Sequence, residues 1–384
     1  MYLPTYEEAL AITEASEAFY VQRGEVEGFE YAMFNYRLAM EKDFIDNKAW
    51  ELRGITYIKD GEDWVCYPML TKFLNLNQGE TVQYNLVKNK EISSVEFKED
   101  GSLISMIHLP NGTVVPKTKM SFENDQTVMT KKIMNVNENI FSVVRRFQGL
   151  VFLFELVSPK NKIVLKYAKT ELRLLQVRDM ITGEYETPER VVEFANMMNI
   201  GSADLITGKS LDDLIEERET VEDVEGWVIK FTDGQFMKLK TLWYIEKHGL
   251  MDDLSKENRI IEMILNDTID DVLGELENGS EEKVEIEEII ELIDVYYNHR
   301  VQKVYALKEL FLVKYNESRK DFAIAHSKSP DFGVVMKHLY VEPKDYGTAI
   351  PKAIKDRMLI ELSHLEKARE FLETLRGEND ETND

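Results

Sequence analysis

The spacing of hydrophobic residues changes near Tyr244, and this change limits the possible folds more than any other feature of the chain. Between Phe29 and Tyr244, hydrophobic and polar residues alternate in short runs that are separated by dipeptides typical of tight turns. These dipeptides are Asp60-Gly61, Asn111-Gly112 and Asp233-Gly234. Alternation has the two-residue period of a strand with one buried face, and Asp-Gly or Asn-Gly pairs close hairpins. We therefore expect residues 1–244 to form an α+β domain rich in antiparallel sheet.

After Tyr244 the hydrophobic period becomes helical. A representative run is Ile286, Ile289, Ile290, Ile293 and Tyr297. Steps of three and four residues place side chains on one face of an α-helix. We therefore expect an all-α domain over residues 245–376, followed by a solvated, disordered acidic tail at residues 377–384.

Two local patterns predict where helices begin. The segment Thr5–Glu8 has the form of a capping box and predicts a helix that extends to about Val21. The segment Thr207–Ser210 (T-G-K-S) resembles the end of a phosphate-binding P-loop, but that loop requires a glycine where Ala203 stands. Ser210 followed by Asp213 instead predicts a helix cap, so we do not expect a P-loop to bind nucleotide.

Composition indicates a folded protein of a reducing compartment. The 384 residues are 43% hydrophobic, which is enough for two domains with buried cores. The single cysteine, Cys66, excludes an internal disulfide. No secretory signal and no apolar run of about 20 residues is present, so we expect a cytoplasmic protein that does not bind membranes.

Net charge restricts the kind of nucleic-acid binding that is possible. The chain has 47 basic and 71 acidic residues, which gives a net charge of −24. Such a charge argues against tight, nonspecific binding of a polyanion. A narrow basic site on an acidic body is still compatible with modest, salt-sensitive binding.

The segment K-E-D-G-S, which begins at Lys98, is a candidate for covalent chemistry. A lysine that acts as a nucleophile must attack as the neutral amine. Gly101 permits close backbone approach, and Asp100 can hold the turn that presents the amine. The alternative is an ordinary turn between two strands.

Two carboxylates and two lysines in strand-like segments are further candidates. Glu155 interrupts the apolar run V-F-L-F-E-L-V, where an unpaired charge would be costly. A ribose hydroxyl would be a suitable partner, and a structural salt bridge is the alternative. An unpaired charge on Glu225 would be costly for the same reason, and its partner would be a metal ion or a reactive lysine. Lys238 and Lys240 would share one strand face, where a phosphate could separate their charges; a solvated strand edge is the alternative.

Several segments together resemble the covalent nucleotidyltransferase superfamily of DNA ligases, RNA ligases and mRNA capping enzymes. Within it, the chain resembles the tRNA-repairing RNA ligases of T-even bacteriophages. The matching segments are E-L-R-G-I-T-Y, T-K-F-L-N-L-N, F-K-E-D-G-S-L-I-S, F-E-L-V-S-P, T-G-E-Y, V-E-G-W-V and K-L-K-T-L-W-Y. The similarity covers about residues 36–244. It implies an antiparallel-sheet nucleotidyltransferase domain followed by an all-α domain that selects the RNA.

The resemblance implies a role for each matching residue. Lys98 would form lysyl-AMP, with Glu225 and Lys119 as further catalytic residues. Glu155 would bind the ribose of ATP, and Tyr244 would contact RNA. The other ATP-binding residues would be Tyr36, Arg53, Lys72, Lys238 and Lys240. An Asp pair, Asp270 and Asp271, weakly matches the family's metal site and would bind Mg²⁺.

The implied reaction joins an RNA 5′-phosphate to an RNA 3′-hydroxyl at the expense of ATP, through lysyl-AMP and RNA-adenylate. The natural substrate would be nicked tRNA, and the enzyme a monomer in the host cytoplasm if a phage encodes it. DNA ligases and capping guanylyltransferases share the lysine chemistry, but a β-barrel follows it there, whereas a helical pattern follows it here. A catalytically silent protein that binds RNA ends is the remaining alternative.

Overall fold

The computed structural model describes residues 2–37, 39–159, 165, 167–247, 257–274, 276, 278–314, 318–329, 331–339 and 346–362. The chain divides into two compact units. Unit 1 comprises residues 1–251 and 270–275, and unit 2 comprises residues 252–269 and 276–384. The short segment 270–275 therefore belongs to unit 1, although it follows part of unit 2 in the sequence. The predicted tail, residues 377–384, lies outside the described residues.

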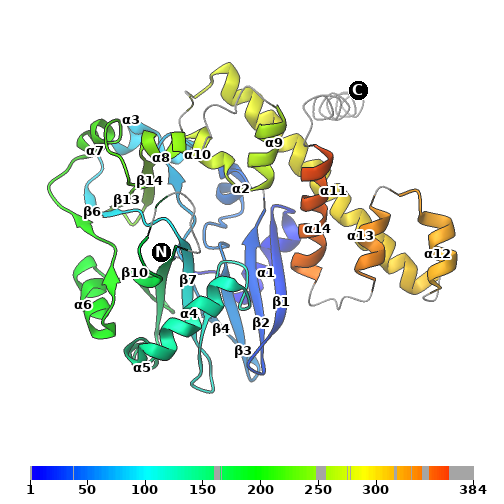
Figure 1. The fold of residues 1–384 in the computed structure, drawn as a ribbon, viewed down its shortest axis with the longest axis horizontal. Helices are drawn as coiled ribbons and strands as arrows, with labels where there is room; N and C mark the ends of the chain where they lie inside the picture. Colours follow the sequence, from blue (N-terminus) through cyan, green and yellow to red (C-terminus); the bar gives the residue numbers. More distant parts are fainter. Residues whose placement is uncertain are drawn as a thin grey trace. The chain divides into compact units, whose positions relative to one another are not determined.

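The first sheet of unit 1 is antiparallel, with the strand order β1-β2-β3-β4 (Figure 1). Its strands are β1 (Phe19–Val26), β2 (Phe29–Tyr36), β3 (Ile55–Asp60) and β4 (Asp63–Tyr67). Helices α1 (Tyr6–Ala15) and α2 (Glu41–Asp46) share a hydrophobic core with β2 and β3. The capping box of Thr5 and Glu8 is confirmed. The predicted end of this helix near Val21 is wrong, because Val21 pairs with Phe34 in the sheet.

The second sheet has the order β11-β10-β9-β7-β8. Its strands are β7 (Ser102–His108), β8 (Val114–Lys117), β9 (Leu150–Val157), β10 (Glu171–Asp179) and β11 (Gly201–Ser202). Helices α4 (Asp125–Val136), α5 (Glu138–Arg146) and α6 (Pro188–Met198) pack on one face, against Phe152, Phe154 and Leu156 of β9. Because side chains alternate along a strand, Glu155 belongs to the opposite face.

The third sheet has the order β12-β6-β13-β14-β5. Its strands are β5 (Leu74–Asn75), β6 (Ile92–Phe97), β12 (Leu205–Ile206), β13 (Gly226–Phe231) and β14 (Phe236–Lys240). Short helices η1 (Glu80–Val82), α3 (Tyr84–Val87) and α7 (Leu211–Glu217) contribute to the core on one face, with Val95 and Trp227. The cap at Ser210, predicted in place of a P-loop, is confirmed. Helix α8 (Leu242–Lys247) follows β14.

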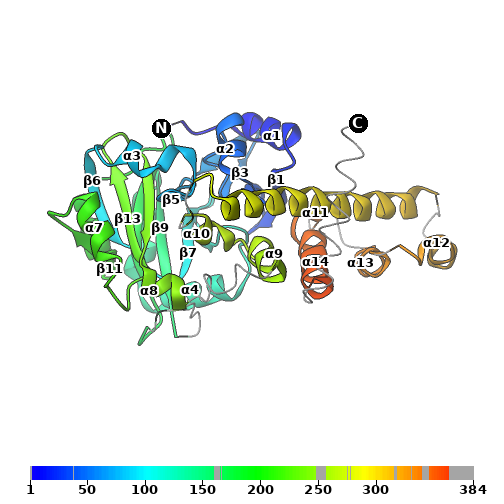
Figure 2. The ribbon, with the colours of Figure 1, turned by 90° about the horizontal axis from the view of Figure 1, so that it is seen from above.

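The second and third sheets meet through the faces that lie opposite their helices. Glu96 of β6 accepts hydrogen bonds from Gln176 Nε2 of β10, at 2.9 and 3.1 Å. Figure 2 shows β9 and β7 of the second sheet beside β13 of the third. The side chains that alternate with the core residues of both sheets therefore point toward the same region, which contains the predicted site residues Glu155 and Lys238.

Unit 2 is helical in the part that the structure describes. Its helices are α9 (Glu257–Leu265), α11 (Glu281–Lys314), α12 (Arg319–His326), α13 (Phe332–Lys337) and α14 (Tyr346–Glu361). Helix α11, the long yellow helix of Figure 2, packs against α9, α13 and α14. Ile286, Ile289, Ile290, Ile293 and Tyr297 are all buried, as their spacing predicted. The expected α+β fold with a helical C-terminal region is thus confirmed.

Helix α10 (Ile269–Leu273) begins at the last residue of a unit 2 segment, and its other residues belong to unit 1. It carries the aspartate pair that the sequence resemblance singled out. Within the described ranges, no helix is long and apolar enough to cross a bilayer.

Candidate active site

Two lysines converge on one buried carboxylate where strands β6, β13 and β14 of the third sheet begin or end. Lys98 follows β6 directly, and its backbone N–H donates to the carbonyl of Gly226 at 2.8 Å. Gly226 pairs with Lys240 in the β13–β14 hairpin, so Lys98 and Lys240 flank it on either side. The Nζ atoms of Lys98 and Lys240 lie 2.8 and 3.0 Å from Oε1 of Glu225. The other oxygen, Glu225 Oε2, is buried without a hydrogen-bond partner among the described residues.

The backbone conformation at position 226 requires a glycine. Its φ of +147° is a conformation that side chains rarely adopt. A Cβ atom there would also collide with the carbonyl oxygen of Leu239 on the neighbouring strand. This glycine lets the backbones of β13 and β14 approach each other closely next to Glu225.

The turn after Lys98 is held by hydrogen bonds from distant parts of the chain. Asp100 accepts from the hydroxyl of Tyr244 at 3.0 Å and from the backbone N–H of Leu165 at 2.7 Å. A side chain at Gly101 would collide with the carbonyl oxygen of Leu156. Tyr244, predicted to contact RNA, is only 2% exposed and holds this turn.

Glu155 of β9 is nearly buried, with 8% of its surface exposed. Burial raises its pKa to about 8, although the nearby Lys98 and Arg53 favour the ionised form. Glu225 and Glu99 oppose ionisation further. The structure gives Glu155 no salt bridge with another described residue, so the structural alternative considered above gains no support.

The aspartate pair of α10 meets three of the predicted phosphate-binding lysines. Asp271 Oδ2 lies 2.8 Å from Lys240 Nζ, and its Oδ1 lies 3.6 Å from Lys238 Nζ. Asp270 Oδ2 lies 2.7 Å from Lys72 Nζ. These lysines are therefore not at a solvated strand edge. They form a buried cluster of positive charge that carboxylates neutralise.

The pKa values of these groups follow from burial and pairing. Burial alone would lower the pKa of Lys72 and Lys240, but their carboxylate partners raise it above the ordinary value. Burial dominates at Lys238, whose pKa is lowered. The pKa of Asp271 is lowered despite burial, because Lys238 and Lys240 stabilise its anion.

Tyr36 lies among three predicted nucleotide-binding cations. Lys119 Nζ and Lys72 Nζ lie 4.6 and 5.1 Å from the centre of its ring. Burial would raise its pKa, but Lys72, Lys119 and Arg53 lower it to about 8. Arg53 also contacts Phe73, and its Nη1 is buried without a hydrogen-bond partner among the described residues.

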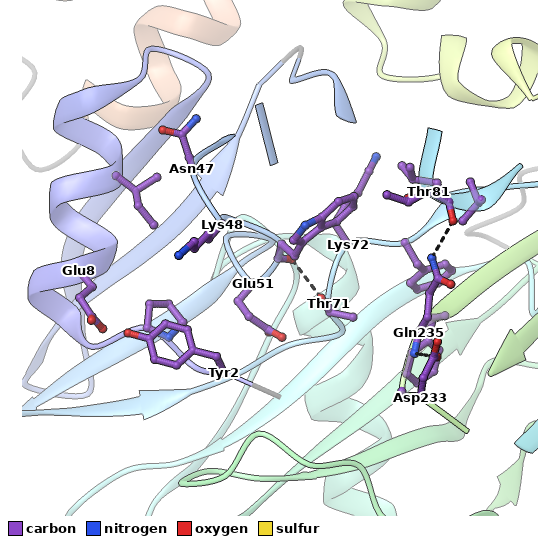
Figure 3. Close-up of a pocket in the computed structure, with 18 of the residues that line it drawn as sticks. Tyr2, Glu8, Asn47, Lys48, Glu51, Thr71, Lys72, Thr81, Asp233 and Gln235 are labelled. Carbon is purple, nitrogen blue, oxygen red and sulfur yellow. Dashed lines mark hydrogen bonds between the residues drawn. The ribbon is translucent and has the colours of Figure 1, made fainter. Parts of the chain in front are cut away.

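A cavity of about 1010 Å³ lies in unit 1, and Lys72 is the predicted site residue among its walls (Figure 3). The segment Thr71–Leu74 forms part of the wall, with a hydrogen bond from Thr71 Oγ1 to the carbonyl of Trp50. Glu8, Glu51 and Asp233 also line it. Carboxylates repel phosphates, so we do not assign the triphosphate to this cavity.

Among the residues that the structure describes, no group of three or more His, Cys, Asp or Glu is arranged to hold a metal ion. Asp270 and Asp271, the predicted metal ligands, contact lysines instead. Sequence reasoning missed the hydrogen bond from Tyr244 to Asp100 and the pairing of α10 with the lysines. No pattern in the sequence signals either contact, since each joins residues more than 30 positions apart.

The geometry therefore combines a lysine beside a buried carboxylate with a cluster of cations suited to phosphates. The family model for RNA ligase matches residues 51–244, just over half of the chain. The chain belongs to this RNA ligase family, and it is an enzyme of that class.

Several known proteins are similar to this chain. A Thermovibrio ammonificans protein named "Putative RNA ligase" is 28% identical over 304 residues, which cover 77% of each chain. An archaeal ATP-dependent RNA ligase structure matches with a TM-score of 0.49 and 14% identity, over 79% of this chain and 80% of that one. An Aquifex aeolicus structure named "Putative ATP-dependent DNA ligase" matches with a TM-score of 0.48 and 14% identity, over 83% and 86%. Structural likenesses this distant do not bear on the activity.

Proposed function

We propose that this RNA ligase uses ATP and acts through lysyl-AMP on Lys98. The observation that carries the proposal is the shared contact of Lys98 and Lys240 with Glu225 Oε1, at 2.8 and 3.0 Å. A lysine nucleophile needs a base that can accept its proton and cations that stabilise the phosphoryl group under attack. These three side chains supply both.

In the first step, the Lys98 amine attacks the α-phosphorus of ATP. A nitrogen–phosphorus bond forms, the bond to the bridging oxygen breaks, and pyrophosphate leaves with the electron pair. Glu225 Oε1, which lies 2.8 Å from Lys98 Nζ, would accept the proton that Lys98 loses. Lys240 and Lys238 would contact the α-phosphate in place of Asp271.

The rest of the nucleotide would bind to the neighbouring groups. Glu155 has a raised pKa and no described salt-bridge partner, so a ribose hydroxyl would satisfy it. Arg53, Lys72 and Lys119, which surround Tyr36, would hold the β- and γ-phosphates.

A divalent cation such as Mg²⁺ commonly binds to one or two carboxylates and to substrate phosphates, so it does not need the group of three protein ligands that the described residues lack. Glu225 Oε2 is a buried oxygen without a described partner, and the carboxylates of Asp270 and Asp271 are also hard oxygen donors. A bound cation would offset the negative charge of the phosphates. We propose that one or two of these carboxylates would hold it together with the phosphates of ATP.

AMP would then pass from Lys98 to an RNA 5′-phosphate, and an RNA 3′-hydroxyl would displace AMP to seal the strand. We propose nicked tRNA as the substrate, with unit 2 as the part that selects it. The net charge of −24 disfavours nonspecific attraction of RNA, so selection would depend on RNA shape.

Incubation with [α-³²P]ATP and Mg²⁺ tests the first step. We expect a labelled protein whose bond is acid-labile and base-stable, as a phosphoramidate is. Lys98→Ala should abolish the label, and Lys132→Met, which changes an exposed lysine of α4, should keep it. An undiminished label in Lys98→Ala would refute the assignment of the nucleophile, and preferential labelling by [α-³²P]GTP would indicate a capping-type enzyme.

A further inference from the structure

Lys117 is a buried lysine for which the reaction described above has no use. It ends β8 and is only 1% exposed. Its Nζ donates to the carbonyl of Gly54 at 2.8 Å and lies 2.9 Å from Sδ of Met69. No carboxylate of the described residues pairs with it, and burial holds its pKa well below the ordinary value. The geometry therefore shows Lys117 as a hydrogen-bond donor to the backbone and not as a member of an ion pair.

The carbonyl that Lys117 binds belongs to a tight junction of three chain segments. Gly54 has a φ of +88°, and its N–H donates to the carbonyl of Phe34 at 2.8 Å. A Cβ on Gly54 would lie 2.7 Å from the carbonyl oxygen of Lys119. That same carbonyl accepts a hydrogen bond from Nδ2 of the fully buried Asn35 at 3.0 Å.

Each of the three segments carries one member of the cluster assigned to the triphosphate. Tyr36 follows Asn35, Arg53 precedes Gly54, and Lys119 lies two residues after Lys117. Lys119 Nζ in turn lies 4.6 Å from the ring centre of Tyr36. The hydrogen bonds of Lys117 and Asn35 therefore fix the relative positions of side chains that come from β2, the start of β3 and the end of β8.

We propose that Lys117 is a positioning residue that aligns Arg53, Lys119 and Tyr36 on the triphosphate of ATP. This inference rests on the proposed function, which assigns the β- and γ-phosphates to the cations around Tyr36, Arg53 and Lys119 among them. It predicts a defect confined to the formation of lysyl-AMP. Sealing of RNA that already carries a 5′-adenylate uses no triphosphate, and it should not depend on Lys117.

The test compares these two steps in Lys117→Met, which keeps the length of the side chain and removes the donor. We expect kcat/KM for ATP in ATP–pyrophosphate exchange to fall about tenfold or more, mainly through KM, because Gly54 loses a buried hydrogen bond. The rate at which the variant seals pre-adenylylated RNA should stay within about twofold of the wild-type rate. Lys132→Met serves as the matched control and should change neither rate.

Equal losses in both steps would show that Lys117 only supports the fold, and unchanged kinetics would show that it has no role; either result overturns the proposal. If Lys117→Met does not fold, Lys117→Gln and Asn35→Ala are judged by the same criterion, since each weakens the same junction. A wild-type protein that neither forms the adduct nor seals adenylylated RNA would refute the proposed function itself. That outcome is distinct from a functional ligase in which Lys117 is silent.

Discussion

At the scale of single residues, the candidate site places ionisable groups where water hardly reaches them. Glu155, Glu225 and Lys240 are 8%, 2% and 7% exposed. Burial of a charge costs stability unless a partner offsets it. Glu225 and Lys240 offset each other, whereas Glu155 has no described ion-pair partner and responds with a raised pKa. We therefore expect Glu155 to be needed for ligation but to lower the stability of the folded protein.

Glu155→Gln should stabilise the free protein at neutral and alkaline pH while it impairs ligation. Between its ordinary pKa of 4.5 and about 8, the folded state keeps a proton that the unfolded chain has lost, so stability falls as pH rises. The glutamine removes this cost, which is at most about 5 kcal/mol and is fully present only above pH 8. Urea unfolding at several pH values measures the difference between the variant and wild type.

The control for Glu155→Gln is Glu193→Gln, which makes the same change at an exposed position of α6. It should shift stability by no more than about 0.5 kcal/mol at any pH. A difference between Glu155→Gln and wild type that does not grow between pH 5 and pH 8 would contradict the raised pKa.

At the scale of elements, α10 is the part of the site that comes from farthest away in the sequence. Asp270 and Asp271 neutralise Lys72, Lys238 and Lys240, which are the lysines that we propose bind phosphates. A carboxylate and a phosphate repel each other when both contact the same ammonium group. Nucleotide binding should therefore compete with these ion pairs.

The double change Asp270→Asn and Asp271→Asn should have opposite effects with and without metal. In EDTA, loss of the two negative charges should tighten pyrophosphate binding about tenfold, measured by titration calorimetry. With Mg²⁺, lysyl-AMP formation should slow if these carboxylates hold the metal as proposed. Unchanged affinity in EDTA would show that the carboxylates do not oppose phosphate binding.

The same double variant should lose stability at pH 7, by about 3 kcal/mol or more, because it leaves buried ammonium groups unpaired. Both aspartates have lowered pKa values, so their contribution is present above the ordinary value of 3.8 and disappears as pH falls through the lowered values. The difference from wild type should therefore shrink in acid. Asp267→Asn, at an exposed position with a φ of +57°, is the matched control, because asparagine tolerates that conformation.

At the scale of the whole molecule, the described site residues lie in unit 1, and unit 2 has its own core and its own buried ion pairs. Arg300 Nε donates to Asp331 at 2.9 Å, and its Nη1 donates to Glu361 at 2.8 Å. Arg300 is 3% exposed, so its loss would leave Asp331 buried without its main partner. This pair offers a way to weaken unit 2 without a change in unit 1.

Arg300→Met should separate substrate choice from chemistry. We expect unit 2 to lose about 3 kcal/mol or more, since one partner of a buried ion pair is removed. Labelling by [α-³²P]ATP should persist, whereas the preference for nicked tRNA over a linear oligonucleotide should fall. The ratio of the two sealing rates measures this preference.

Arg259→Met, which removes an exposed pair with Glu262 in α9, is the control for Arg300→Met and should leave the ratio unchanged. If Arg300→Met is destabilised and the ratio still does not change, unit 1 alone selects the RNA. If the label disappears, unit 2 supports the catalytic unit directly.

Local features of the sequence determined much of this protein. Hairpin dipeptides and alternation predicted the antiparallel sheets, and the three- and four-residue spacing around Ile289 predicted a buried helix face. The motif around Lys98 could be found because other matching motifs accompany it, since a Lys-Glu-Asp-Gly segment alone also fits an ordinary turn between strands. Backbone conformation and hydrophobic period act over a few residues, so the sequence expresses them directly.

Only the tertiary structure decided which charges meet. The pairing of Lys72 with Asp270 and the support of Lys117 for Gly54 join positions 198 and 63 residues apart. The predicted end of α1 was corrected by the sheet, in which Val21 pairs with Phe34. The partners of charged and hydrogen-bonding groups depend on distance in space and on burial, and the local sequence determines neither.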